Sequence, residues 1–238
     1  MTTYVFDMDG TLTPARLPMT AEFAIQFYEW QKTHKSFIAT GSDFKKVEEQ
    51  LPPSVISSFT GIYSSMGNVL SAKGSLIYQN NFRADPKLFA MLEDYRKNTT
   101  YPGTLYPNYI EERIGMINFS VLGRDCPYSE RERYSAWDRT EQEREKIAEE
   151  LRGKFPQYEI AVGGSISMDI TPQGFGKGQI AKHLRETYPN DKIVFFGDKT
   201  FVGGNDYELA NTLQNMDNTQ VVQVNDPEDV LMFLHNNS

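Results

Sequence analysis

The chain has few cysteines, no long apolar stretch and a deficit of positive charge. Cys126 is the single cysteine among 238 residues, so no disulfide can form within the chain, which suits a reducing compartment. The net charge of −8 argues against a nucleic-acid partner. No apolar run approaches the length of a membrane span, and the N-terminus lacks the basic start and long apolar run of a signal peptide. We therefore expect a cytoplasmic protein that binds neither nucleic acid nor membranes.

The apolar content is sufficient for a sizeable core. Apolar residues make up 39% of the chain and include 13 Tyr and 15 Phe, which argues against bulk disorder. Strands are expected at 35–40, 61–64, 192–196 and 219–224, separated by helical patterns. The run 192–196 is almost wholly apolar, as in a strand that is buried on both faces. The sequence therefore predicts an α/β core with a parallel sheet.

The middle third of the chain has a different pattern. It contains a helix beginning at Asp85, an alternating strand at 116–122, a long charged helix at 138–154, and two strands within 158–170. This order predicts an antiparallel sheet with helices, inserted between the strand–helix units of the core. The inserted domain is placed at 82–174, and the core at 1–81 with 175–238.

Residues 4–13 combine an apolar strand with two carboxylates. Asp7 and Asp9 are two apart, so an extended backbone sends both side chains to the same side. Two carboxylates at the end of a buried strand repel each other and resist burial, which Mg²⁺ with its preference for oxygen ligands would resolve. The chemical interpretation is a nucleophilic Asp that accepts a phosphoryl group beside a second Asp that moves a proton. The alternative is an ordinary Asp-Gly turn after an edge strand.

Further polar residues follow the other predicted strands. Thr40 and Ser42 come after the second strand, while Asp198 and Asp206 come after the strand at 192–196. In open parallel sheets, ligands bind at the carboxyl ends of the strands, and hydroxyls with free amides at a helix start can hold phosphate. Each residue taken alone is equally well explained as a helix cap or turn residue. Together the carboxylates indicate a metal site at this edge.

These stretches resemble a known family. The pattern of residues 5–13 is the signature of the haloacid dehalogenase superfamily of phosphotransferases. The chain as a whole resembles the eukaryotic-type phosphomannomutases, a likeness that covers the inserted cap domain. It is carried by residues 6–16, 41–47, 113–124, 164–169, 195–206 and Lys177. The resemblance implies a Rossmann-like α/β core with an inserted α+β cap that bears an antiparallel sheet.

The resemblance also implies roles for individual residues. Asp7 is the phosphorylated nucleophile, Asp9 is the general acid/base, and Lys177 neutralises the transferring phosphoryl group. Mg²⁺ is bound by Asp7, by the backbone carbonyl of Asp9 and by Asp198, with Asp206 in support. The implied substrate residues are Thr40 and Ser42 for the transferring phosphoryl group, Arg16, Arg113, Arg124 and Arg131 for the sugar phosphate, and Ser167 and Asp169 for sugar hydroxyls. Without the resemblance, each arginine could equally be an exposed surface residue, and the last pair could be the solvent face of a strand.

The implied activity is the interconversion of mannose 6-phosphate and mannose 1-phosphate through phospho-Asp7. The enzyme would be primed by a hexose 1,6-bisphosphate, would depend on Mg²⁺ and would form a homodimer through its caps. A non-catalytic binding protein is disfavoured, because it would not need a nucleophile beside an acid.

Two segments depart from the family pattern. Residues 65–67 are Ser-Met-Gly, where the family commonly has Glu-Asn-Gly. Thr40 stands where the eukaryotic enzymes carry glycine, and threonine is more typical of the superfamily's phosphatases. A second cation site cannot be recognised after Asp206. These departures keep a sugar-phosphate phosphatase as the alternative function.

Overall fold

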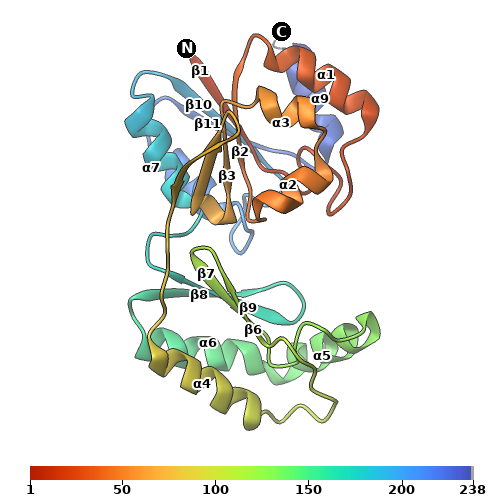
Figure 1. Ribbon diagram of the computed structural model, residues 1–238, viewed down its shortest axis with the longest axis vertical. Coiled ribbons are helices and arrows are strands. Elements are labelled where there is room, and N and C mark those ends of the chain that lie inside the picture. Colours follow the sequence, from red (N-terminus) through yellow and green to blue (C-terminus); the bar gives the residue numbers. More distant parts are fainter. Residues whose placement is uncertain (237–238) are drawn as a thin grey trace. The chain divides into compact units, whose positions relative to one another are not determined.

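The computed structural model describes residues 1–236 and divides the chain into two compact units (Figure 1). The core unit consists of Met1–Asn80 with Gly174–Ser238, and the cap unit is Asn81–Gln173. The cap unit interrupts the core unit once, so the chain passes between the two units in two short segments, around residues 80 and 174. None of the helices within residues 1–236 has the length and apolar character needed to cross a membrane.

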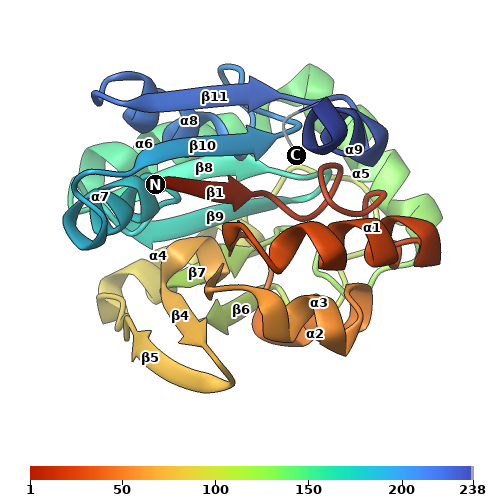
Figure 2. The same ribbon diagram turned by 90° about the horizontal axis from the view of Figure 1, so that it is seen from above.

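The core unit is built on a seven-stranded, mostly parallel sheet. Its order is β11-β10-β1-β2-β3-β4-β5, and the neighbours from β11 to β3 pair in parallel. The parallel strands are β11 (Thr219–Gln223), β10 (Lys192–Gly197), β1 (Thr2–Phe6), β2 (Lys35–Ala39) and β3 (Gly61–Ser64). Figure 2 shows β11, β10 and β1 running the same way. The antiparallel strands β4 (Val69–Ala72) and β5 (Ser75–Gln79) complete one edge. The predicted parallel sheet is confirmed.

Helices cover both faces of this sheet. The helices on one face are α1 (Ala21–Gln31), α2 (Phe44–Gln50), α3 (Pro53–Ser58) and α9 (Pro227–Asn236), and those on the other are α7 (Gly178–Thr187) and α8 (Tyr207–Gln214). Alternation along β10 explains its apolar sequence, because Val194 and Phe196 pack under the first group while Ile193 and Phe195 pack under the second. Each such buried side chain contributes about 1.5–3 kcal/mol of transfer free energy. The strand therefore needs apolar residues at successive positions.

Side-chain caps determine where two of the core helices begin. Thr20 accepts a hydrogen bond from the amide of Phe23 at the start of α1, and Asp43 accepts one from the amide of Lys46 at the start of α2. Asp43 is thus the N-cap of α2. Ser42, for which the sequence allowed a capping role, does not fill it.

The cap unit contains a four-stranded antiparallel sheet of order β6-β7-β9-β8. Its strands are β6 (Ile110–Arg113), β7 (Met116–Phe119), β9 (Ser167–Pro172) and β8 (Tyr158–Gly163), and its helices are α4 (Pro86–Lys97), α5 (Tyr128–Glu141) and α6 (Glu143–Lys154). Apolar side chains of the sheet and helices share one core, which includes Leu92, Phe119, Leu151 and Ile170. The predicted antiparallel sheet is confirmed.

The prediction of one long helix at 138–154 is wrong, because this segment belongs to two helices. The backbone of Gln142 is left-handed, with φ of 55°, and this residue separates α5 from α6. The break lets Asp138 at the end of α5 face Arg144 at the start of α6. Their buried side chains are joined at 2.8 Å, and the Asp138 carboxylate also accepts a hydrogen bond from the amide of Arg144. This buried ion pair joins the end of α5 to the start of α6 on either side of Gln142.

Candidate active site

Two neighbouring strands of the core bring their polar residues to one edge of the sheet. β1 and β10 pair in register up to Phe6 and Phe196, and the amide of Asp7 extends the ladder by donating to the carbonyl of Phe196 at 2.9 Å. Asp198 follows the end of β10. Carboxylate oxygens of Asp7, Asp198 and Asp206 all lie within 4.8 Å of one another. Asp7 and two carboxylates from the distant C-terminal part of the chain therefore form one cluster.

Lys177 is the cation inside this cluster. It precedes α7, is fully buried, and its Nζ lies 2.6 Å from Asp7 Oδ1 and 2.5 Å from Asp206 Oδ1. A cation in this position is unfavourable with the helix dipole, so the two carboxylates are what stabilise it. Burial alone would lower the pKa of Lys177, but Asp7 and Asp206 raise it above its usual value. The lysine is therefore charged at neutral pH.

The environment of Asp7 makes it an unusual carboxyl group. Burial raises the pKa of Asp7 to about 7; Lys177 opposes this rise, and Asp206 adds to it. Its Oδ1 is bound by Lys177, whereas its Oδ2 is buried and has no hydrogen-bond partner among the described residues. Oδ1 of Asp198 is likewise buried without a partner. Unpaired buried oxygens are costly, and these two match the oxygen ligands that Mg²⁺ prefers.

Asp9 has a different environment from the other carboxylates. Its Oδ1 accepts a hydrogen bond from the backbone amide of Arg16 at 2.7 Å, and its Oδ2 accepts one from Ser42 Oγ at 3.4 Å. Arg16 has a left-handed backbone, with φ of 63°, and this turn directs its amide to Asp9. Among the described residues, the side chain of Asp9 is not part of the close group of carboxylates that could hold a metal ion. Its carboxylate is instead oriented by two donors, as a residue that exchanges a proton needs to be.

Gly10 allows the two strand ends to approach each other. Its φ is +90°, and a Cβ atom at this position would lie 2.5 Å from Oδ2 of Asp198. Any larger residue would strain the backbone and displace this carboxylate from the cluster.

Backbone hydrogen bonds hold the loop that carries Thr40 and Ser42. The buried Thr40 Oγ1 accepts from the amide of Ser42 at 3.1 Å. The amides of Ser65 and Met66 donate to the carbonyls of Ser42 and Thr40 at 2.8 and 3.1 Å. The segment 65–67, which departs from the family pattern, therefore holds the loop of Thr40 and Ser42 in place through its backbone amides. Ser65 and Met66 both adopt positive φ in the short helix η1 (Ser65–Gly67).

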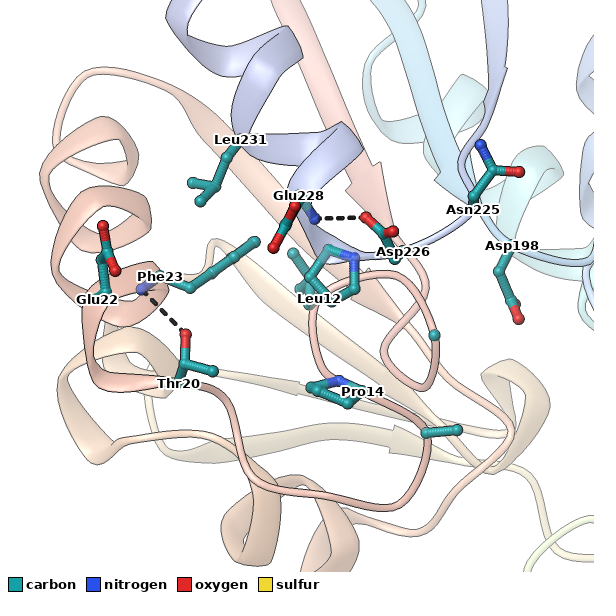
Figure 3. A pocket seen from close by; sticks show the side chains of 13 residues that line it. Leu12, Pro14, Thr20, Glu22, Phe23, Asp198, Asn225, Asp226, Glu228 and Leu231 are labelled. Atoms are coloured by element: carbon teal, nitrogen blue, oxygen red, sulfur yellow. Dashed lines mark hydrogen bonds between the residues drawn. The ribbon is translucent and has the colours of Figure 1, made fainter.

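A pocket of about 660 Å³ opens in the core unit between the segment after β1 and the start of α9 (Figure 3). Gly10 and Asp198 contribute to its lining. The other lining residues are Leu12, Pro14, Ala15, Thr20, Glu22, Phe23, Asn225, Asp226, Pro227, Glu228 and Leu231. The lining contains four carboxylates and neither lysine nor arginine, so this pocket is a poor place for a phosphate group.

In the cap unit, polar residues form a row across the sheet. Glu111 pairs with Asn118 in the register of β6 and β7, and Asn118 pairs with Asp169 in that of β7 and β9. Asn118 Nδ2 donates to Asp169 Oδ1 at 2.6 Å, and its Oδ1 accepts from Nη1 of Arg124 at 2.5 Å. Burial raises the pKa of Asp169, while the hydrogen bond from Asn118 opposes that rise. The sequence analysis had not singled out Glu111 or Asn118.

The predicted arginines of the cap lie around this row. Arg113 Nη2 and Arg124 Nε contact the same oxygen of Glu111, at 2.6 and 2.9 Å, and Arg131 Nη2 donates to the carbonyl of Arg124 at 2.6 Å. The side chain of Ser167 is buried at the start of β9. The predicted sites therefore fall into two groups, one in each unit: Asp7, Asp9, Thr40, Ser42, Lys177, Asp198 and Asp206 with Arg16 in the core, and Arg113, Arg124, Arg131, Ser167 and Asp169 in the cap.

The fold of this chain is similar to that of several solved structures. A haloacid dehalogenase-like hydrolase from Bacteroides thetaiotaomicron matches with a TM-score of 0.66 at 13% identity, covering 100% of this chain and 99% of that protein. A Thermoplasma acidophilum protein matches with a TM-score of 0.62 at 15% identity, covering 99% and 97%. At these identities the likeness establishes the fold, and it confirms the predicted fold class.

Sequence comparisons place the chain more closely. The family model described as eukaryotic phosphomannomutase matches residues 25–237. A probable phosphomannomutase of Caenorhabditis elegans is 37% identical over 248 aligned positions, covering 99% of this chain and 94% of that protein. A phosphomannomutase of Dendrobium officinale is 35% identical over 236 positions, covering 94% and 89%. The chain therefore belongs to the eukaryotic phosphomannomutase family of enzymes.

Proposed function

We propose that this protein interconverts mannose 6-phosphate and mannose 1-phosphate by passing a phosphoryl group through Asp7. The observation that carries the proposal is the buried Asp7 carboxylate, whose Oδ1 is neutralised by Lys177 while its Oδ2 has no partner among the described residues. A carboxylate in this state has one oxygen available for bond formation and a cation beside it to offset added charge. Relatives named phosphomannomutase at 33–37% identity give the substrate class.

In the first transfer, an Asp7 oxygen forms a bond to the phosphorus of a hexose 1,6-bisphosphate. The bond between that phosphorus and the sugar oxygen breaks, and Asp9 gives its proton to the departing oxygen. In the second transfer, Asp9 takes a proton from a hydroxyl of the sugar monophosphate, that oxygen bonds to the phosphorus, and the bond from phosphorus to the Asp7 oxygen breaks, which gives a bisphosphate. Bound in the opposite orientation, this bisphosphate returns its other phosphoryl group to Asp7 as in the first transfer and leaves the isomeric monophosphate. Arg16 and Ser42 hold the Asp9 carboxylate for both steps through the bonds at 2.7 and 3.4 Å.

Mg²⁺ fits the core cluster and is proposed as the cofactor. Asp7, Asp198 and Asp206 would hold it, with the backbone carbonyl of Asp9 as a further ligand implied by the family resemblance. When bound, it offsets the negative charge on the phosphoryl group in transfer. Lys177 supplies a second, permanent positive charge next to Asp7 whether or not the ion is present.

The remaining site residues are proposed to bind the sugar phosphate. Thr40 and Ser42 hold the phosphoryl group in transfer, and Arg16 with the cap arginines Arg113, Arg124 and Arg131 binds the phosphate that is not transferred. Ser167 and Asp169 hold sugar hydroxyls. The resemblance further supports a homodimer joined through the caps, and the single Cys126 suits a cytoplasmic location. Light scattering on the purified protein at several concentrations tests the dimer.

A two-product assay separates the proposed mutase from the sugar-phosphate phosphatase. The protein is incubated with Mg²⁺, mannose 1-phosphate and a trace of a hexose 1,6-bisphosphate, and mannose 6-phosphate and free phosphate are measured in the same sample. The proposal requires mannose 6-phosphate with little free phosphate, and it requires activity to fall when the bisphosphate is removed. Free phosphate without mannose 6-phosphate would establish the phosphatase. The Asp7→Asn variant should make neither product while keeping the native circular-dichroism spectrum.

A further inference from the structure

One carboxylate of the cap unit holds two of its arginines. Glu111 lies in β6, and its Oε2 accepts from Arg113 Nη2 at 2.6 Å and from Arg124 Nε at 2.9 Å. A second donor of Arg124, Nη1, is occupied by Asn118 at 2.5 Å. The hydrogen bond from Arg113 holds the pKa of Glu111 below its usual value, so this carboxylate is ionised at neutral pH. Glu111 thus occupies donors on both guanidinium groups that an anionic ligand would use.

The local charges make Glu111 a counter-ion. Arg113, Arg124 and Arg131 contribute three positive charges, and Glu111 and Asp169 contribute two negative ones, so the cluster carries a small positive excess. A phosphate bound by Arg113 and Arg124 would bring its oxygens close to the Glu111 carboxylate, which would repel them. Side chains of Arg113, Arg124 and Glu111 are 30–43% exposed, so water and solutes can reach the pair. A carboxylate in such a position can be exchanged for another anion at modest cost.

We propose that Glu111 is a displaceable counter-ion that holds Arg113 and Arg124 together for a sugar phosphate and limits how tightly its phosphate is bound. This inference rests on the proposed function, because it gives the cap arginines the task of binding the phosphate that is not transferred. Glu111 is a positioning residue that acts through the two guanidinium groups. Weaker binding of this phosphate suits an enzyme that must release its product, since excess affinity for the ground state slows turnover.

Replacing Glu111 by Gln should therefore tighten binding. The substitution keeps the size of the side chain and an oxygen acceptor, but it removes the charge that competes with phosphate. Partly exposed ion pairs contribute up to about 1 kcal/mol each, which corresponds to roughly fivefold in an equilibrium constant. We expect mannose 6-phosphate to bind roughly fivefold more tightly to Glu111→Gln. Damage to the cap would have the opposite sign, because it would weaken binding.

The adjacent residue provides a matched control. Glu112 lies next to Glu111 in the same strand, but its side chain points to the other side of the sheet and is exposed. Glu112→Gln changes the net charge by the same amount, so it corrects for the general electrostatic field of the protein. Both substitutions are made in the full chain carrying Asp7→Asn, which prevents turnover, and mannose 6-phosphate binding is measured by titration calorimetry with Mg²⁺ present.

The inference requires Glu111→Gln to bind more tightly than both the parent and Glu112→Gln. It also requires the gain to disappear when Arg124→Ala is added, because the effect acts through that guanidinium group. Equal affinities for the two glutamine variants, or weaker binding by Glu111→Gln, would overturn it. If Glu111→Gln binds more tightly but the wild-type protein makes no mannose 6-phosphate, the counter-ion role stands and the mutase proposal fails. The absence of any mannose 6-phosphate binding would overturn both.

Discussion

Lys177 offers a direct test of how the core cluster is stabilised. The substitution Lys177→Met keeps a long unbranched side chain in a fully buried position but removes the charge that contacts Asp7 and Asp206. Removing one partner of a buried ion pair typically costs about 3–5 kcal/mol, because the remaining charges are left uncompensated. Against a total stability of about 5–15 kcal/mol, this is a large effect. We expect the variant to be destabilised by about 3–5 kcal/mol at pH 8 without divalent cations.

The loss should depend on pH with a defined sign. Burial already raises the pKa of Asp7 to about 7, and removing Lys177 takes away the interaction that opposes this rise, so the pKa of Asp7 rises further. A carboxyl group whose folded pKa is raised destabilises the folded state as pH increases from its unfolded value, about 3.9, through the folded value. The variant should therefore lose less stability at pH 5, where Asp7 is largely protonated, than at pH 8.

The two tryptophans allow the core to be followed separately. Trp30 is in α1 of the core unit and Trp137 is in α5 of the cap unit, so in a Trp137→Phe background fluorescence reports on the core alone. Urea unfolding at pH 5 and pH 8 gives the free energy of each protein. Lys182→Met is the matched control, because Lys182 is exposed on α7, the helix that follows Lys177, and its effect should stay within about 0.5 kcal/mol. A Lys177→Met protein as stable as this control, or one with no pH dependence, would refute the reasoning.

Three further substitutions have defined outcomes. Asp191→Asn weakens the contact with Lys35 at 2.7 Å and should lower the free energy of unfolding by about 1 kcal/mol. The hydrogen bond from Lys35 lowers the pKa of Asp191, so this loss is present above about pH 4 and disappears as pH falls through the folded pKa. Urea unfolding at pH 7 and at about pH 2.5, below the pKa of ordinary carboxyl groups, would detect the difference. Gly10→Ala should lower kcat at least about tenfold by displacing Asp198, and unchanged kinetics would show that this approach is not needed. Arg124→Ala should raise the mannose 6-phosphate dissociation constant with Mg²⁺ affinity unchanged, as measured by calorimetry with each ligand; equal losses for both ligands would contradict the separation of the two groups.

The sequence predicted the core sheet because its physical demands are local. A strand buried on both faces requires consecutive apolar residues, and residues 192–196 show this plainly. The predicted position of Asp7 and Asp198 at one edge of the sheet followed from the rule that ligands bind at the carboxyl ends of parallel strands. Local pattern and general topology were therefore sufficient to group these carboxylates before any contact was known.

Features that depend on distant pairings were not predictable in this way. The contact of Lys177 with both Asp7 and Asp206 joins residues that no periodicity relates. The row that includes Glu111 and Asn118 needs the register of two strand pairs, because a shift of one residue would turn each side chain to the other face. The helix break at Gln142 is a left-handed residue without the glycine that usually marks such a turn. The pair formed by Asp138 and Arg144 on either side of the break is likewise visible only in the folded chain.

The central claim is that Asp7 carries the phosphoryl group. The most direct measurement incubates the wild-type protein with Mg²⁺ and a hexose 1,6-bisphosphate, stops the reaction in cold acid and locates the added mass by peptide mass spectrometry. We expect one phosphoryl group on the peptide that contains Asp7, its absence from Asp7→Asn, and its loss when a sugar monophosphate is added before the acid. A phosphoryl group on another residue, or none in a protein that still converts mannose 1-phosphate to mannose 6-phosphate, would contradict it.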